Sequence, residues 1–396
     1  MMRIFKNLAV GLAIIAMMTT VMTAQTKPAN DESRANEEDE FAAQAIQTRM
    51  PGEEEPHEGT WLQWAHHYTY GRAYRNSLDA MFVELTRTLA QSENVHIVTY
   101  NYEETKRVTK LLRNAGVSLA KVDFVMRRTD DVWVRDNGPI FVYDNNNELK
   151  IADWGFNGWG FDTPYRNDDS VPVGVANNLE MPRIDLNDIV LEGGAIEIDG
   201  NGVLLATRSS TMENGRNEHL TQAEFENALT ANLGVTKFIW LDGKYGGEDD
   251  ITDTHIDGFA RFAQGNKIVT MGSASLRYWG LSNSDINRLY NATNINGAPY
   301  SFVQLPLTAR NVVTTSGENL GFKGSYVNYY VANTVVLMPV YNDPNDIIAK
   351  NLLQNIYPNR TVVGIDVRNL YKNGGMVHCI TQQQPAETNL TAGENN

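Results

Sequence analysis

Apolar residues recur along this chain at two spacings, one typical of amphipathic helices and the other of half-buried strands. After Ser77, a residue type that often caps helices, apolar side chains follow at helical intervals as far as Leu89. A run rich in β-branched residues at 95–99 predicts a strand. The same criteria predict helices over residues 103–114, 222–232 and 344–357, and one that starts near Ser284.

Four segments are typical of β-hairpins, because apolar or alternating runs flank a turn signal such as Gly265-Asn266. They span residues 139–154, 195–207, 259–271 and 326–340. A polar side chain stands at the entrance of each hairpin, and Cys379 follows at a similar interval; the entrance residues are Asp136, Glu192, His255 with Asp257, and Asn328. We therefore predict an α/β fold of pseudo-repeats around an axis, each offering a functional residue to one central point.

The N-terminal residues have the pattern of an export signal. Arg3 and Lys6 precede an apolar stretch from Leu8 to Met18, which is too short to span a bilayer, and small and polar residues follow. We expect a signal peptide over residues 1–24, a disordered acidic linker over 25–49, one folded domain over 50–386 and a flexible tail over 387–396. Signal cleavage would leave the protein exported, in the periplasm or outside the cell.

The formal net charge of the chain is -15. A surface of this sign repels nucleic acid and anionic lipid and favours cationic ligands. We therefore expect no nucleic-acid partner, no membrane association after signal cleavage, and a small cationic substrate. A homo-oligomer is left open.

The chain has one cysteine, Cys379. In an exported protein a single thiol has no internal disulfide partner, so it is an accident, an intermolecular bridge or a reactive group. The preceding His378, the glycines at 374 and 375 and the polar run after the cysteine favour a reactive group. As a thiolate it could attack carbon, and His255 could move the protons because imidazole titrates near neutral pH.

Carboxylates complete the candidate set. Glu192 could orient His255, while Asp136 and Asp257 could hold a planar guanidinium, whose donors match paired carboxylates. Such carboxylates should raise the pKa of the thiol in the empty site. Each residue alone has an ordinary explanation, such as a buried apolar cysteine or an ion pair between Arg135 and Asp136. Their joint occurrence at hairpin entrances favours a functional site.

At the level of motifs, the chain resembles the agmatine deiminases of the guanidine-modifying pentein superfamily, which also holds bacterial, Porphyromonas-type peptidylarginine deiminases. The shared motifs run from MPGEEEPHEGTW through DVWVRDNGP, WGFNGWG, LEGG, TDTHID, GSYVNYYVAN and DPND to HCITQQQP. They cover essentially the whole domain over 50–386, which the resemblance makes a deiminase catalytic domain. The resemblance implies a pentein fold, a five-bladed α/β propeller with pseudo-fivefold repeats.

Residue roles follow from the same resemblance. Cys379 is then the nucleophile, His255 the acid and base, and Glu192 its partner, while the catalytic carboxylates Asp136 and Asp257 also clamp the guanidinium. Trp133 matches a pocket tryptophan of the family that could stack on the substrate. The alternative, that it is an ordinary aromatic residue of the core, stays open. Asn328 joins the expected substrate-binding set. The resemblance implies no metal and no cofactor.

The expected reaction is hydrolytic deimination of agmatine to N-carbamoylputrescine and ammonia through a covalent thiouronium intermediate on Cys379. The alternative is a secreted peptidylarginine deiminase that converts arginine in peptides to citrulline. That enzyme would need a basic group for the peptide carboxyl side, for which Arg166, Arg208 and Arg216 lie in loop-like segments.

Four positions depart from the pattern common in agmatine deiminases. Asn373 and Met376 replace a glycine and an asparagine before the cysteine, Ala65 replaces a proline, and Thr254 replaces a glycine. These departures leave the catalytic set intact and put the substrate in doubt more than the reaction type.

Two other classes of function fit the sequence less well than a deiminase. A metal hydrolase could use His66, His67, His255 and Asp257, but their spacing matches no recognisable zinc template and the thiol would have no role. A non-catalytic binding protein would be expected to have lost a catalytic residue, and none is missing.

Overall fold

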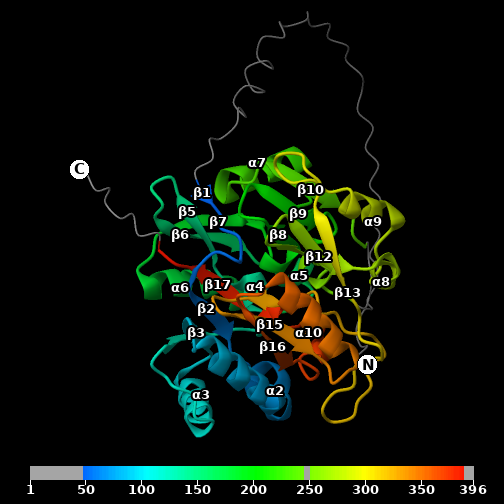
Figure 1. The fold of residues 1–396 in the computed structure, drawn as a ribbon. Helices are drawn as coiled ribbons and strands as arrows, with labels where there is room; N and C mark the ends of the chain where they lie inside the picture. The colour runs from blue at the N-terminus through cyan, green and yellow to red at the C-terminus, as the bar shows by residue number, and fades with distance from the viewer. Residues whose placement is uncertain (1–47, 245–249, 388–396) are drawn as a thin grey trace, which may run out of the picture. The chain divides into compact units, whose positions relative to one another are not determined.

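The computed structural model describes residues 48–244 and 250–387, which form a mixed α/β fold (Figure 1). In this part of the chain the strands make five separate sheets of three or four strands each. The expected signal peptide over 1–24, the linker up to residue 47 and the tail from residue 388 lie outside the described residues. No helix in the described ranges is long and apolar enough to cross a membrane.

One unit recurs in all five sheets: two antiparallel strands, then a helical segment, then a third strand parallel to the second. The four predicted hairpins are confirmed as the antiparallel pairs of four of these sheets. Their strands are β5 (Ile140–Asp144), β6 (Leu149–Gly155) and β7 (Arg183–Val190); β8 (Ile196–Ile198), β9 (Val203–Thr207) and β10 (Lys237–Leu241); β11 (Ala260–Ala263), β12 (Lys267–Met271) and β13 (Ser301–Leu305); and β14 (Tyr330–Val331), β15 (Val335–Val340) and β16 (Thr361–Asp366).

The fifth sheet joins the two ends of the domain. Its first strand, β17 (Gln382–Pro385), pairs antiparallel with β2 (His57–Gln63), and β2 is followed by the parallel strands β3 (Asn94–Thr99) and β4 (Val122–Met126). Figure 1 shows the red β17 beside the blue β2. The short β1 (Thr48–Arg49) pairs with β5, so the last two residues of the expected linker belong to a sheet.

Most predicted helices are confirmed within a few residues. They correspond to α3 (Tyr102–Asn114), α7 (Gln222–Leu233), α9 (Asn283–Tyr290) and α10 (Asn345–Ile356). Further helical segments between strands are α5 (Gly158–Phe161), α6 (Val171–Leu179) with the preceding η1 (Asp168–Ser170), and α8 (Ser273–Tyr278).

The predicted cap at Ser77 is wrong. Helix α2 spans His67–Leu89 with a break at Gly71, and Ser77 lies inside it, with its hydroxyl donating to the carbonyl of Tyr74 at 2.7 Å. The N-cap is His66, whose ring nitrogen accepts a hydrogen bond from the backbone N–H of Tyr68. A histidine ring in this role is outside the usual set of capping residues, which explains the error.

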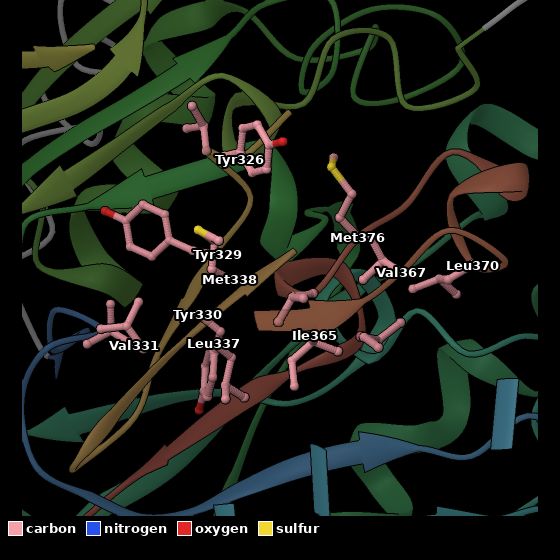
Figure 2. Close-up of a cluster of buried hydrophobic side chains, with 14 of the residues drawn as sticks. Tyr326, Tyr329, Tyr330, Val331, Leu337, Met338, Ile365, Val367, Leu370 and Met376 are labelled. Atoms are coloured by element: carbon pink, nitrogen blue, oxygen red, sulfur yellow. The ribbon is translucent and has the colours of Figure 1, made fainter. Parts of the chain in front are cut away.

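A cluster of buried apolar side chains fixes the segment that leads to Cys379. Leu337, Met338 and Ile365 from β15 and β16 pack with Leu370 and Met376 (Figure 2). Burial of a side chain of this size contributes about 1.5–3 kcal/mol. The chain just before the cysteine is therefore anchored to a sheet and not carried on a free loop.

Candidate active site

The predicted functional residues sit on short turns that precede the first strand of each unit. The turns are α4 (Val134–Asn137) before β5, η2 (Gly193–Ala195) before β8, η3 (Ile256–Gly258) before β11, the residues just before β14, and η5 (His378–Ile380) before β17. Turn α4 contacts both η2 and η5, and η2 contacts η3. The structure thus brings the entrance residues together, as the pseudo-repeat pattern predicts.

The thiol of Cys379 lies beside one carboxylate and one amide. Its Sγ is 3.7 Å from Asp257 Oδ2 and 3.4 Å from Asn328 Nδ2. The residue is half-buried. Burial, followed by the negative charges of Asp257 and Asp136, raises the pKa of the Cys379 thiol well above its usual value. The sequence-based expectation of a raised thiol pKa in the empty site is confirmed.

The imidazole of His255 bridges two carboxylates. Its Nε2 lies 2.6 Å from Glu192 Oε2, and its Nδ1 lies 3.6 Å from Asp136 Oδ1. Burial opposes the charged ring, but the carboxylates of Asp136, Glu192 and Asp257 outweigh it and raise the pKa of His255 to about 9. The ring is therefore protonated at neutral pH and can supply a proton to a leaving group.

Neutral donors hold the carboxylate of Asp136. The indole N–H of Trp159 donates to Oδ2, and the backbone N–H of Gly194 donates to Oδ1, both at 3.0 Å. Burial raises the pKa of Asp136 to about 6, and nearby Asp257 and Glu192 act in the same direction against His255.

Position 194 has space only for glycine. A Cβ built there would lie 2.6 Å from Asp136 Oδ1, 2.7 Å from His255 Nδ1 and 3.1 Å from Asp257 Oδ2. These separations are shorter than ordinary contacts, and the three groups belong to the candidate site. The glycine pair after Glu192 therefore allows the turns η2, α4 and η3 to approach closely.

Arg216 is a structural partner of Glu192, not a free group for a substrate carboxylate. Its guanidinium is fully buried and donates to Glu192 Oε1 at 2.7 Å and to Asp253 Oδ2 at 2.7 Å. Although burial opposes ionisation, the charge of Arg216 and the bond from His255 lower the pKa of Glu192. Of the other two arginines considered for this role, Arg208 pairs with Asp242 and Arg166 is exposed.

Trp133 is buried against the glycines that precede the cysteine. Its side chain is 6% exposed, and a Cβ at Gly375 would lie 2.0 Å from its ring. Stacking of this ring on a substrate stays a prediction.

Asn328 is fully buried, and its amide contacts the turn that carries Cys379. Its Oδ1 accepts from the backbone N–H of His378 at 2.9 Å, while its Nδ2 faces Cys379. These contacts favour a role in positioning the thiol over direct binding of substrate.

The departures from the agmatine deiminase pattern have different structural settings. Met376 and Ala65 are buried in the apolar core, and Asn373 is exposed at the end of η4 (Tyr371–Asn373). Thr254, next to His255, is buried and has a left-handed backbone with φ of 74°. A β-branched residue is strained in that region, so glycine would fit here without strain.

The residues of the alternative metal site have other partners. His66 Nε2 bonds to the carbonyl of Thr129 at 3.0 Å, and His67 Nδ1 to Glu104 at 3.1 Å. Across residues 48–244 and 250–387, no group of three or more His, Cys, Asp and Glu side chains is arranged to hold a metal ion.

Sequence reasoning missed two contributors to this site, Trp159 and Gly194, and also Glu53, whose carboxylate contacts His378 on the turn that carries Cys379. Trp159 and Gly194 lie in the motifs WGFNGWG and LEGG, so a signal was present for both. Glu53 lies among three consecutive glutamates, and nothing in the sequence distinguishes it from its neighbours.

Comparison with known proteins gives a consistent result. Residues 49–385 match the family described as Porphyromonas-type peptidyl-arginine deiminase. The chain is 32% identical over 363 residues to the agmatine deiminase of Pseudomonas aeruginosa (strain LESB58), and 30% over 362 residues to that of Pseudomonas fluorescens (strain SBW25); each match covers 85% of this chain and 95% of the relative. The solved agmatine deiminase of Enterococcus faecalis superposes with a TM-score of 0.77 at 26% identity, covering 87% of this chain and 99% of that one.

The replacement Gly194→Ala should fold but lose activity. The added methyl group displaces Asp136 and His255, and a shift of about 1 Å in catalytic groups costs about 100-fold in rate. The matched control is Gly272→Ala, whose Cβ would meet only the flexible end of Gln304 at 3.2 Å. Ammonia release from a guanidinium substrate and the melting temperature are measured for both, and a fully active Gly194→Ala enzyme would contradict the site geometry.

Proposed function

The chain belongs to the Porphyromonas-type peptidyl-arginine deiminase family, and from this premise we propose that it hydrolyses agmatine to N-carbamoylputrescine and ammonia. As a hydrolase it acts on the C–N bond of a linear amidine. The observation that carries the proposal is the convergence of one thiol, one protonated imidazole and three carboxylates from separate units. Agmatine is preferred because the relatives with 30–32% identity are named agmatine deiminases.

The charges of the site suit a flat cation. Asp136 is held by neutral donors, and Asp257 lies within 3.7 Å of the Cys379 sulfur. A guanidinium between these two carboxylates offers each of them two N–H donors in one plane. The same cation lowers the pKa of the thiol that the carboxylates raise, so the substrate helps to create the nucleophile.

In the first half of the reaction, the thiolate of Cys379 forms a C–S bond with the central guanidinium carbon. Protonated His255 gives its proton to one terminal nitrogen, and the C–N bond breaks to release ammonia. The remaining amidine is covalently attached to sulfur as a thiouronium. Glu192 stabilises the imidazolium before this proton transfer.

In the second half, neutral His255 takes a proton from a water molecule whose oxygen attacks the same carbon. The C–S bond breaks and the electron pair returns to sulfur. The hydroxyl proton on the carbon leaves to solvent, where it converts the released ammonia to ammonium, and the neutral ureido product forms. The sum is one guanidinium and one water converted to one urea derivative and one ammonium ion. Asp136 and Asp257 hold the carbon in place in both halves.

The five sheets support a propeller arrangement, which we include in the proposal. Each sheet has the same order of strands, and the turn before each first strand contributes a residue to one site. We infer that the five sheets are blades around a pseudo-fivefold axis. A crystal structure whose first strands do not surround a common axis would contradict this.

We also propose that the protein acts after export, because residues 3–18 have the pattern of a signal peptide. The mature protein from the native host should then begin near Gln25, as intact-mass measurement would reveal. A recovered chain that still carries residues 1–24 would contradict export by this route.

The value of kcat/KM should follow a bell-shaped pH dependence. It should rise as Asp136 ionises near pH 6 and as the Cys379 thiol, whose pKa is raised in the free enzyme, loses its proton, and loss of the His255 proton near pH 9 should end this rise. In Glu192→Gln, one of the carboxylates that raise the pKa of His255 is lost, so the basic limb should move to lower pH. A basic limb unchanged in that variant would show that another group sets it.

The direct test is incubation of the purified protein with agmatine, free arginine and an arginine-containing peptide. Ureido product and ammonia should form from agmatine, and Cys379→Ala at unchanged melting temperature should lose at least about 10⁴-fold in kcat. Turnover of the peptide alone would replace the proposed substrate by peptidyl-arginine. Full turnover by Cys379→Ala would overturn the mechanism.

A further inference from the structure

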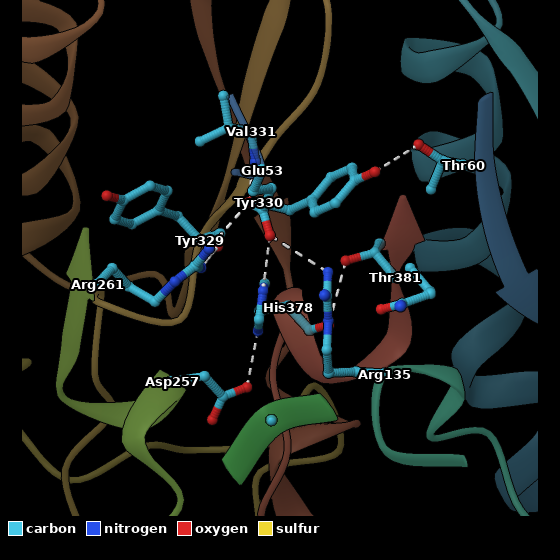
Figure 3. Close-up of polar contacts among 12 residues, drawn as sticks. Glu53, Thr60, Arg135, Asp257, Arg261, Tyr329, Tyr330, Val331, His378 and Thr381 are labelled. Carbon is cyan, nitrogen blue, oxygen red and sulfur yellow. Dashed lines mark hydrogen bonds and ion pairs between the residues drawn. The ribbon is translucent and has the colours of Figure 1, made fainter. Parts of the chain in front are cut away.

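Glu53, in the segment between β1 and β2, is the meeting point of four other elements (Figure 3). Its buried carboxylate accepts from the backbone N–H of Val331 at 2.8 Å and pairs with Arg261 at 2.9 Å. It also lies 3.3 Å from Arg135 Nη2 and 2.8 Å from His378 Nε2. These partners come from β14, β11, α4 and η5. Turns α4 and η5 carry Asp136 and Cys379, and β11 follows the turn that carries Asp257.

His378, the residue before the nucleophile, connects Glu53 to the substrate clamp. Its Nε2 lies 2.8 Å from Glu53 Oε2, and its Nδ1 lies 2.8 Å from Asp257 Oδ2. A carboxylate only accepts, and a neutral imidazole carries a single N–H. Two such contacts therefore require two protons in the chain Glu53–His378–Asp257, one in each gap.

Of the groups around His378, Glu53 most favours a second proton on the ring. Burial, followed by the charges of Arg135 and Arg261, lowers the pKa of His378, and Glu53 is the strongest influence in the opposite direction. The hydrogen bond from His378 in turn lowers the pKa of Asp257, against the effect of burial. The Oδ2 atom of Asp257 that receives this bond is the one 3.7 Å from the sulfur of Cys379.

We propose that Glu53 is a positioning residue for the deimination: through its contact with His378 Nε2 it orients the ring so that Nδ1 meets Asp257 and aims that carboxylate at the guanidinium beside the thiol. This inference rests on the proposed function. Glu53 touches neither the sulfur nor the carboxylate that clamps the substrate, and acts only through the histidine between them.

The test uses Glu53→Gln, which keeps the shape of the side chain and removes its charge. The negative charge that most favours a protonated His378 is then lost, so the ring compensates the charge of Asp257 less well. The groups around His378 are Glu53, Asp257, Arg135 and Arg261, and those acting on Cys379 include Asp257 and Asp136. Because the negative charge of Asp257 beside the sulfur is then less compensated, the pKa of the Cys379 thiol should rise by about one unit.

The readout is the rate of iodoacetamide alkylation against pH, which reports on Cys379 alone because the chain has one cysteine. The midpoint should move to higher pH in Glu53→Gln, and kcat/KM for agmatine should fall about 10-fold or more. The matched control is Glu55→Gln. This variant also removes one negative charge, from a residue two positions after Glu53 whose side chain pairs with Arg49. Its alkylation midpoint should stay at the wild-type pH.

A second variant separates positioning from a structural role. In His378→Asn the amide can still donate to Asp257 but cannot reach Glu53, so this variant alone should show the same shift. Adding Glu53→Gln to it should change the alkylation midpoint no further, whereas two independent structural effects would add. An additive double variant, or a Glu53→Gln protein with only a lower melting temperature, overturns the proposal. Alkylation needs no substrate, so wild-type protein inactive on all three guanidines would refute the proposed function while leaving the alkylation result to judge Glu53.

Discussion

The structure depends on balancing buried carboxylates where the turns of separate sheets meet. Glu192 and Asp257 lie close enough to Asp136 to raise its pKa. Like charges at such distances in a poorly solvated region are costly unless each has a partner. Glu192 is compensated by Arg216 and Asp257 by His378, whereas Asp136 is held by neutral donors beside the protonated ring of His255. A bound guanidinium completes the balance, so the preference for a cation follows from the fold itself.

The regular part of this design could be predicted from the sequence. The hairpins have turn signals and alternating runs, and the residues at their entrances converge as the repeat pattern indicates. What sequence could not predict depends on contacts between distant segments. Arg216 is sequestered by Glu192 and Asp253, and Glu53 meets His378 from the opposite end of the domain. No local signal marks either residue for its partner, and the histidine cap of α2 breaks the usual capping rule.

Backbone strain gathers near the same centre. Asp253 and Thr254, just before His255, have positive φ angles of 56° and 74°, and Trp159, which donates to Asp136, has a φ of 56°. Such conformations are uncommon for residues with a side chain and persist only where the surroundings enforce them. These residues lie beside the imidazole and the carboxylate. Their strained backbone fits a site in which the orientation of polar side chains is kept at the expense of favourable backbone angles.

The pairing of β17 with β2 has a consequence for biosynthesis. A ribosome adds β17 after the other strands of the domain, whereas its partner β2 is added among the first. The turn that carries the sulfur immediately precedes β17, so a nascent chain holds the site's carboxylates and imidazole long before it holds the thiol. The complete site therefore cannot assemble until the domain has been synthesised through β17.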